Sequence, residues 1–234
     1  MAYTKDICHI CENEFTRLGS HWYQSSCDYP ELSDEQKEIV TGLLMGDGCL
    51  VNRDGNPYLV VQCTKREYLE RLDSIFGNIS SGEPRLHITG EKLKKKYGDW
   101  LGASKDSEYS DQYRWQTRGI PGLSEFSSWY GDDGKVYPEQ IELTPMTLTH
   151  WYCGDGNYNN NGTNNYISIG VSNEKTEKEK IENMFERKGL PRPNRWSEYE
   201  NKAEIVWNVN ESKRLMEYMN DSYDGYEYKW MNKQ

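Results

Sequence analysis

The fold is decided by two apolar stretches with the same ending, Val40-Thr-Gly-Leu-Leu-Met-Gly-Asp-Gly48 and Leu148-Thr-His-Trp-Tyr-Cys-Gly-Asp-Gly156. A capping box of Ser33 and Gln36 precedes the first stretch and predicts the start of a helix. Before the second stretch, Thr144 is suited to be an N-cap and Pro145 to be the first helical residue. The sequence therefore predicts two buried helices that both end at a Gly-Asp-Gly turn.

The spacing of these helices indicates an internal repeat. The two aspartates are 155 − 47 = 108 residues apart, and the strand expected at 58–64 matches the one at 166–172 at the same distance, 166 − 58 = 108. Each half then continues with a helix, near 66–77 and 174–188, a second hairpin and a last helix. We expect an α+β fold of two αββαββα halves, 31–140 and 141–234, after a small segment at 1–30.

The ends of the two helices suggest a cation site. Glycines at 42, 46 and 154 permit close backbone approach, so the helices can pack side by side and end together. Helix C-termini carry partial negative charge, and Asp47 and Asp155 add two carboxylates there. A divalent hard cation such as Mg²⁺, suited to phosphodiester hydrolysis, would compensate this charge. The alternative, two solvated turns, is less expected for a symmetric pair than for a single motif.

The N-terminal segment carries a second set of metal-ligand residues. Cys8 and Cys11 form a C-x-x-C pair, and His21 and Cys27 follow within one finger-length span. This order resembles a shortened zinc finger and predicts a structural Zn²⁺ with four protein ligands. A chance cluster of free thiols and a redox role are the weaker alternatives. The other cysteines are scattered singly, as in the core of a protein from a reducing compartment.

Charge and hydropathy restrict the class of protein. The 234 residues hold 28 Lys and Arg against 38 Asp and Glu, a net charge of −10, which argues against a nucleic-acid binder held by non-specific charge and fits a host with concentrated salt. No stretch reaches the roughly 20 apolar residues of a membrane span, and the first residues lack the apolar core of a signal peptide. We therefore expect no membrane partner and an intracellular, cytoplasmic protein.

With these motifs the chain resembles the single-chain LAGLIDADG homing endonucleases over roughly residues 32–234. The two signature helices carry the resemblance, together with Tyr113-Arg-Trp-Gln-Thr-Arg118, Trp129-Tyr-Gly-Asp-Asp-Gly-Lys135-Val-Tyr-Pro138 and Tyr226-Glu-Tyr-Lys229-Trp. The finger-like segment lies outside it. The resemblance implies a monomer in which two pseudo-symmetric halves form a saddle of antiparallel sheets.

Site residues follow from the resemblance. It implies that Asp47 and Asp155, with the carbonyls of Gly46 and Gly154, bind two or more Mg²⁺ ions that cut both DNA strands. Catalytic support is implied for the lysines and one polar residue at matching positions, which are Lys135, Lys229, Lys65 and Asn173. The alternative for the lysines is an exposed side chain without a catalytic role. His150 departs from the family, which favours a small residue there, and it is better explained as a core histidine than as a ligand.

The polar faces of the two sheets are the expected DNA contacts. Alternation places Arg114, Gln116 and Arg118 on one face of their strand, and the same reasoning selects Gln62 and Thr64 earlier, and Asn208 and Asn210 on a later strand. Arg, Gln and Asn are the residues that pair bidentately with base edges in the major groove. A solvated sheet face would have the same pattern.

These expectations add up to a site-specific double-strand DNA endonuclease. The resemblance implies one long, imperfectly palindromic target, short 3′ overhangs and a role in intron mobility. Two alternatives stay open on the same fold: an RNA-binding intron maturase, whose partner is intron RNA, and a catalytically silent DNA-binding regulator. Retention of both aspartates and both lysines favours cleavage.

Overall fold

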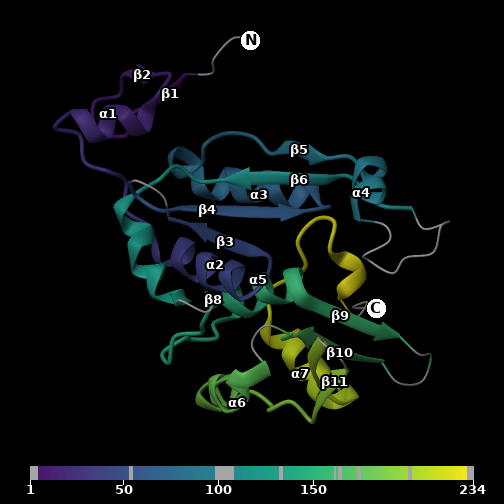
Figure 1. Ribbon diagram of the computed structural model, residues 1–234. Coiled ribbons are helices and arrows are strands. Elements are labelled where there is room, and N and C mark those ends of the chain that lie inside the picture. Colours follow the sequence, from purple (N-terminus) through teal and green to yellow (C-terminus); the bar gives the residue numbers. More distant parts are fainter. Residues whose placement is uncertain are drawn as a thin grey trace. The chain divides into compact units, whose positions relative to one another are not determined.

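The computed structural model describes residues 5–52, 55–97, 108–131, 134–160, 162, 165–172, 175–199 and 202–230 (Figure 1). The chain forms two compact units, each built from two segments. The first unit comprises Met1–Leu32 and Cys49–Ser124, and the second comprises Ser33–Gly48 and Glu125–Gln234. Within the described part of the chain, no helix is both long enough and apolar enough to cross a membrane.

The first unit contains the finger-like segment and one antiparallel sheet. The finger consists of a short hairpin, β1 (Asp6–Ile7) and β2 (Glu14–Phe15), and helix α1 (Leu18–Gln24). The sheet has the order β3-β4-β6-β5, and its strands are β3 (Gly48–Val51), β4 (Tyr58–Cys63), β5 (Arg85–Ile88) and β6 (Gln112–Gln116). Helix α3 (Arg66–Phe76) packs against β4 and β6 (Figure 1), and a 3₁₀ turn, η1 (Gly77–Ile79), follows it. Along the sequence, helix α4 (Gly90–Tyr97) follows β5 and precedes β6.

The second unit contains the helix pair and the other sheet. Helix α2 (Asp34–Met45) lies beside α5 (Pro145–Asp155), as Figure 1 shows. The sheet has the order β11-β12-β10-β9, with β9 (Gly156–Asn160), β10 (Asn165–Gly170), β11 (Arg195–Tyr199) and β12 (Lys202–Val206). Its further elements are the hairpin β7 (Tyr130–Gly131) and β8 (Gly134–Lys135), helices α6 (Lys178–Arg187) and α7 (Val209–Tyr218), and the 3₁₀ turns η3 (Lys175–Glu177) and η4 (Glu227–Lys229).

The two sheets confirm the predicted repeat. Read from the strand that follows each signature helix, the order β3-β4-β6-β5 corresponds to β9-β10-β12-β11. Helices α3 and α6 occupy the same place in each half, close to the predicted ranges. The first half departs from the αββαββα pattern at its end, where a 3₁₀ helix, η2 (Pro121–Trp129), replaces the last α-helix. A Pro, a Gly and three Ser in these nine residues are weak helix formers, which explains the difference.

The helix pair begins and packs as its sequence predicts. The Gln36 N–H donates to Ser33 Oγ at 3.2 Å and the Ser33 N–H donates to Gln36 Oε1 at 3.0 Å, which completes the capping box of α2. Thr144 Oγ1 accepts from the Thr147 N–H at 3.1 Å at the start of α5. A Cβ built on Gly42 would lie only 2.4 Å from the Thr147 carbonyl oxygen. Only glycine therefore permits the two backbones to approach this closely.

Candidate functional site

Both signature helices end at one place in the second unit. A Cβ built on Gly154 would lie 3.2 Å from Gly46 Cα, 3.0 Å from Asp47 N and 3.5 Å from Asp47 Cγ. Asp155, the last residue of α5, is half-buried. The ends of the two helices thus adjoin, and each carries an aspartate, so partial negative charge of the helix ends and full negative charge occur in the same region.

A lysine lies at the end of each helix. On η4, Lys229 is buried, and its Nζ donates to the carbonyl oxygens of Cys153 at 2.6 Å and Gly154 at 3.1 Å, with Tyr152 O at 3.5 Å. On β8, Lys135 is half-buried, and its Nζ lies 3.4 Å from Gly46 O. Each lysine thus contacts the carbonyl of the glycine that precedes one aspartate, which is the pairing expected of repeated halves.

Asp47 lies in the field of both lysines. The residue keeps access to solvent, yet the protein around its carboxylate raises its pKa by desolvation. The charges of Lys229 and Lys135 act in the opposite direction and offset part of this rise, so that the pKa is raised overall. The two lysines therefore favour the ionised form of the aspartate, which is the form that binds a cation.

Two tyrosines that the sequence reasoning missed support this arrangement. Tyr137, two residues after Lys135, donates its hydroxyl to Met45 O at 3.0 Å. On α5, the Tyr152 hydroxyl donates to Lys229 O at 2.8 Å, and burial raises its pKa. Tyr137 follows Lys135 in a stretch already singled out, and Tyr152 belongs to the second signature stretch, but neither pattern reveals which backbone groups the hydroxyls reach.

His150 is a core residue, as predicted. Its side chain is buried, and its Nε2 lies 3.0 Å from the Tyr223 hydroxyl. Burial lowers its pKa to about 3, so the imidazole is neutral at pH 7. A Cβ built on Gly42 would lie 2.7 Å from His150 Cβ, so the glycine of one helix lies directly against the start of the histidine side chain on the other.

Two further candidates for catalytic support were predicted at the ends of the matched strands. Lys65 belongs to the first unit, where it is the half-buried N-cap residue of α3. Asn173 lies outside the residues that the structure describes.

In the first sheet, the structure aligns several of the predicted DNA contacts. Gln62 lies opposite Arg114 across β4 and β6, and Val60 lies opposite Gln116. The neighbouring residue Trp115 is buried, whereas Arg114 and Gln116 keep part of their surface exposed. Thr64 is exposed just beyond the end of β4. This alternation gives the sheet one polar face.

The prediction that Asn208 and Asn210 belong to a strand was wrong. Strand β12 ends at Val206, and Asn208 is the N-cap of α7, where its Oδ1 accepts from the Glu211 N–H at 3.0 Å. Asn210 lies inside α7. The capping preference of asparagine prevailed over the alternating pattern.

Arg118 lies beyond the end of β6 and is already engaged. Its guanidinium donates to Asn78 O at 2.6 Å and to Asp6 Oδ2 at 2.5 Å. The prediction that Arg118 lies on the strand was wrong because the strand ends at Gln116, and the ion-pair partner, 112 residues away in the sequence, had no sequence signal.

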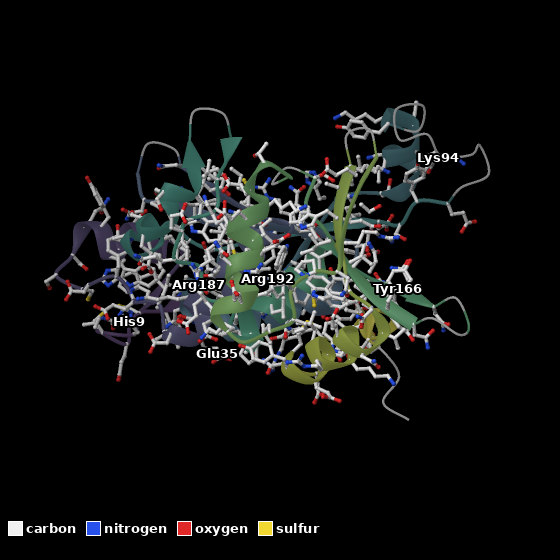
Figure 2. The ribbon with its side chains drawn as sticks, turned by 90° about the horizontal axis from the view of Figure 1, so that it is seen from below. His9, Glu35, Lys94, Tyr166, Arg187 and Arg192 are labelled. Atoms are coloured by element: carbon white, nitrogen blue, oxygen red, sulfur yellow. The ribbon has the colours of Figure 1, made fainter. Side chains whose placement is uncertain are left out.

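Sequence reasoning also missed polar residues in both sheets. Arg85 lies opposite Arg114 on β5. In the second sheet, Asn157 lies opposite Ser168 and Asn159 lies opposite Tyr166, which is labelled in Figure 2. The signal was the asparagine-rich run that follows the second Gly-Asp-Gly.

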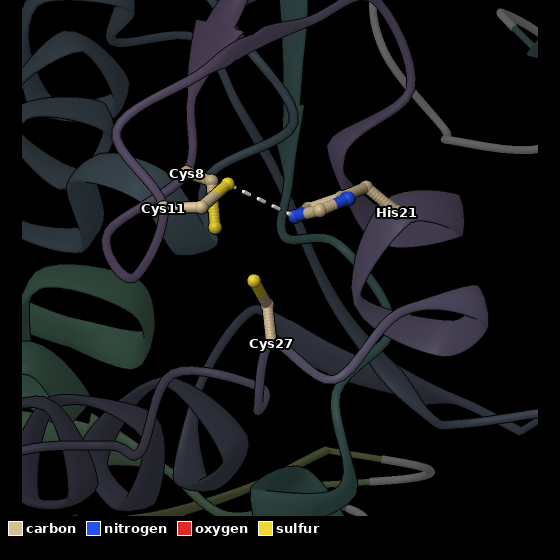
Figure 3. A group of neighbouring side chains, drawn as sticks. All are labelled: Cys8, Cys11, His21 and Cys27. Carbon is tan, nitrogen blue, oxygen red and sulfur yellow. Dashed lines mark hydrogen bonds between the residues drawn. The ribbon is translucent and has the colours of Figure 1, made fainter.

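The finger brings its four predicted ligands together. The ligand atoms of Cys8, Cys11, His21 and Cys27 all lie within 4.8 Å of one another (Figure 3). Although burial raises the pKa of the Cys8 thiol, hydrogen bonds from the backbone of Cys11 and Ile10 and from nearby side chains lower it to about 6 overall. Three thiols and one imidazole form a donor set that suits Zn²⁺.

Known proteins resemble this chain in part of its sequence or in its fold. The homing endonuclease I-WcaI bound to its DNA recognition sequence superposes with a TM-score of 0.71 at 19% identity, over 87% of this chain and 88% of that one. Two RecA proteins match 54% of this chain. That of Mycobacterium shimoidei is 32% identical over 136 residues, and that of Mycobacterium leprae (strain TN) is 28% identical over 137. The chain spans 27% and 16% of the length of these two relatives.

The family model of the LAGLIDADG DNA endonuclease family matches residues 37–215, which include both signature helices and most of both sheets. The chain therefore belongs to the LAGLIDADG DNA endonuclease family.

Proposed function

We propose that this protein is a site-specific double-strand DNA endonuclease that hydrolyses phosphodiester bonds with a divalent metal. The observation that carries the proposal is the pairing of one aspartate and one lysine at each of two adjoining helix ends. Two similar sets of residues fit a substrate with two strands to cut. One chain supplies both sets, so a monomer is sufficient.

The residues at the helix ends fit a hard cation. Asp47 and Asp155 offer carboxylate oxygens, and the carbonyls of Gly46 and Gly154 add neutral oxygen donors, which is the ligand type that Mg²⁺ prefers. When bound, the metal would supply Lewis-acid stabilisation of the phosphate and an activated water. Because each glycine carbonyl already contacts a lysine, the aspartates are the principal ligands in this proposal.

The protein groups have separable tasks in this scheme. Lys229 and Lys135 favour the ionised form of Asp47 against the desolvation of its carboxylate, and their positive charge stabilises negative charge that develops on the phosphate. Lys65 and Asn173 are proposed to assist from the strand ends. Target recognition is assigned to the polar sheet faces, whose arginine and amide side chains match base edges in the major groove. A long, imperfectly palindromic site agrees with two related but non-identical sheets, and we propose that cleavage leaves short 3′ overhangs.

The finger is proposed to hold a structural Zn²⁺. In a tetrahedral site with Zn–S bonds of about 2.3 Å, sulfur ligands lie roughly 3.8 Å apart. The four ligand atoms, all within 4.8 Å of one another, need only a small contraction to reach this geometry. With four protein ligands, the metal would stabilise the fold of the segment and leave no position for a substrate.

Selection of a cleaved sequence would test the proposed function. The purified chain is incubated with a randomised plasmid library in Mg²⁺, at low and at molar salt because the net charge of −10 favours a high-salt host. The control is the double variant Asp47→Asn and Asp155→Asn. Linear products that share one sequence and 3′ overhangs, and that the control does not form, are the expected result.

Two other outcomes would overturn the proposal. DNA binding without cleavage at every salt concentration would indicate a silent regulator. Binding of structured intron RNA in preference to DNA would indicate a maturase.

A further inference from the structure

A groove runs between the finger and the sheet of the first unit. It has a volume of about 810 Å³, and its lining is polar apart from Leu18 and the glycines. From the finger it is lined by Asp6, Thr16, Arg17, Leu18, Gly19 and Ser20. The sheet and its turns contribute Tyr58, Ser81, Arg85, Gln116, Thr117, Arg118 and Gly119. Hydroxyls, amides and guanidinium groups together are the donors that phosphate oxygens accept from.

Arg118 fastens the finger to the sheet. Its side chain is only 13% exposed, and its Nη2 lies 2.5 Å from Asp6 Oδ2 on the finger. The sheet side of this contact is well anchored, because the Arg118 N–H donates to Ile79 O at 2.7 Å and its Nη1 donates to Asn78 O at 2.6 Å. A partly buried, charge-assisted contact of this kind fixes orientation better than an exposed ion pair does.

The finger is acidic overall, but most of its acidic residues do not line the groove. Residues 5–32 hold five acids (Asp6, Glu12, Glu14, Asp28 and Glu31) and two basic residues (Lys5 and Arg17). Of these acids only Asp6 lines the groove, where Arg118 neutralises it. Arg17 and Arg85 are exposed, and within the described part of the chain neither has an ion-pair partner. The groove is therefore a basic region on an otherwise acidic segment.

We propose that this groove binds the phosphodiester backbone of duplex DNA that flanks the recognition site. Arg17 and Arg85 contact phosphates, and Arg118 is a positioning residue that holds the finger in place through Asp6. The finger thus lengthens the DNA contact of the first sheet, since Gln116 belongs both to the groove and to the polar face of β6. The proposal rests on the proposed function, because the ligand is DNA.

Equilibrium binding of two duplexes would test the groove. One duplex ends at the core site identified by cleavage, and the other carries about ten more base pairs on each side. Both are titrated with the full chain in Ca²⁺ at several salt concentrations. We expect the longer duplex to bind more tightly and with a steeper dependence on salt, because each neutralised phosphate adds about 0.9 to the slope.

Three variants separate contact from positioning. Arg17→Ala should weaken binding of the longer duplex and reduce its salt slope by about 1, with no change on the core duplex. Asp6→Asn should act in the same direction by releasing the finger, and removal of zinc from the wild-type chain should reproduce it. The matched control is Arg71→Ala, on exposed helix α3 surface outside the groove, which should change neither duplex.

The outcomes distinguish this proposal from the proposed function. Equal affinity and equal salt slope for both duplexes, with normal cleavage of the core site, would overturn the groove and leave the endonuclease intact. Equal effects of Arg17→Ala and Arg71→Ala on binding of the longer duplex would likewise overturn the groove and leave the endonuclease intact. Failure of the library selection to yield any cleaved site would overturn both proposals, because the core duplex is defined by cleavage.

Discussion

Helices α2 and α5 are repeated elements that end side by side, yet the lysine at the end of each is held differently. Lys229 is 7% exposed and meets three carbonyl oxygens of α5, whereas Lys135 is half-buried and lies near one carbonyl of α2. The third signature position differs as well, with Gly42 facing His150. The two helix ends therefore carry the same kinds of group, an aspartate and a lysine, but the contacts that hold these groups in place differ. This difference can be measured.

Replacing either aspartate should reduce DNA cleavage more than any other change, and the two replacements should have similar effects. Asp47→Asn and Asp155→Asn each remove the charge of a proposed metal ligand, so each should lower double-strand cleavage by at least about 100-fold, more than loss of a residue that only orients a metal ligand. Supercoiled plasmid carrying the target provides the measurement, with nicked and linear products followed separately. Retained linear product in either variant would mean that this aspartate is not needed for cleavage.

Gly42 should be the most sensitive position for stability. In Gly42→Ala the new methyl group would lie 2.4 Å from a backbone oxygen of α5, and overpacking of this kind costs about 1–3 kcal/mol. Gly19→Ala is the matched control, because a Cβ on Gly19 meets no atom within 4 Å and alanine in a helix gains roughly 0.5–1 kcal/mol. Urea unfolding would measure both. Equal midpoints for the two variants would contradict the close approach of α2 and α5.

Replacing the two lysines should change the free energy of unfolding by different amounts, whereas the effects on the rate of cleavage should be more alike. Lys229→Met leaves buried carbonyls of α5 without their donor and should cost about 1–3 kcal/mol, whereas Lys135→Met should cost less than about 1 kcal/mol. Both variants should cleave DNA more slowly at a temperature where both are folded. Thermal unfolding and single-turnover cleavage are the measurements. A larger stability loss for Lys135→Met would reverse the comparison.

His150 should make a smaller contribution that depends on pH. Its pKa of about 3 in the folded chain lies below the ordinary value of 6.5, so the unfolded chain binds more protons between these two pH values. Stability is therefore full above about pH 6.5 and falls as the pH decreases toward 3, by at most about 1.4 kcal/mol per pH unit from this group. His150→Gln should remove this part of the slope. Urea midpoints from pH 7 to pH 5 would measure it, and an unchanged slope would show that His150 does not titrate on unfolding.

Much of this architecture could be predicted from local sequence signals. The capping box at Ser33, the N-cap at Thr144 and the 108-residue spacing fix where the helices begin and how often the unit repeats. The ligands of the finger lie within one short span, so their spacing was sufficient to predict a cluster. These features depend on contacts between residues near one another in the sequence or on exact repetition.

Contacts between distant segments were not predictable in the same way. Two such contacts, Arg118 with Asp6 and Tyr137 with Met45, join residues about 100 positions apart, and no periodic pattern in the sequence indicates them. The prediction for Asn208 was wrong for a local reason. An alternating strand pattern and an N-cap are both possible at this asparagine, and the N-cap forms a hydrogen bond that the strand does not offer.

The meeting of Gly42 and His150 also bears on how a duplicated chain chooses its partner. The two residues are equivalent in the repeat, since 150 − 42 = 108, so each helix could in principle pair with the same helix of another molecule. Two copies of α5 would bring two histidines together at a crossing where a glycine now lies opposite His150, and two copies of α2 would leave that place without a side chain. One unlike pair of side chains thus makes this crossing suited to two unlike helices, α2 and α5.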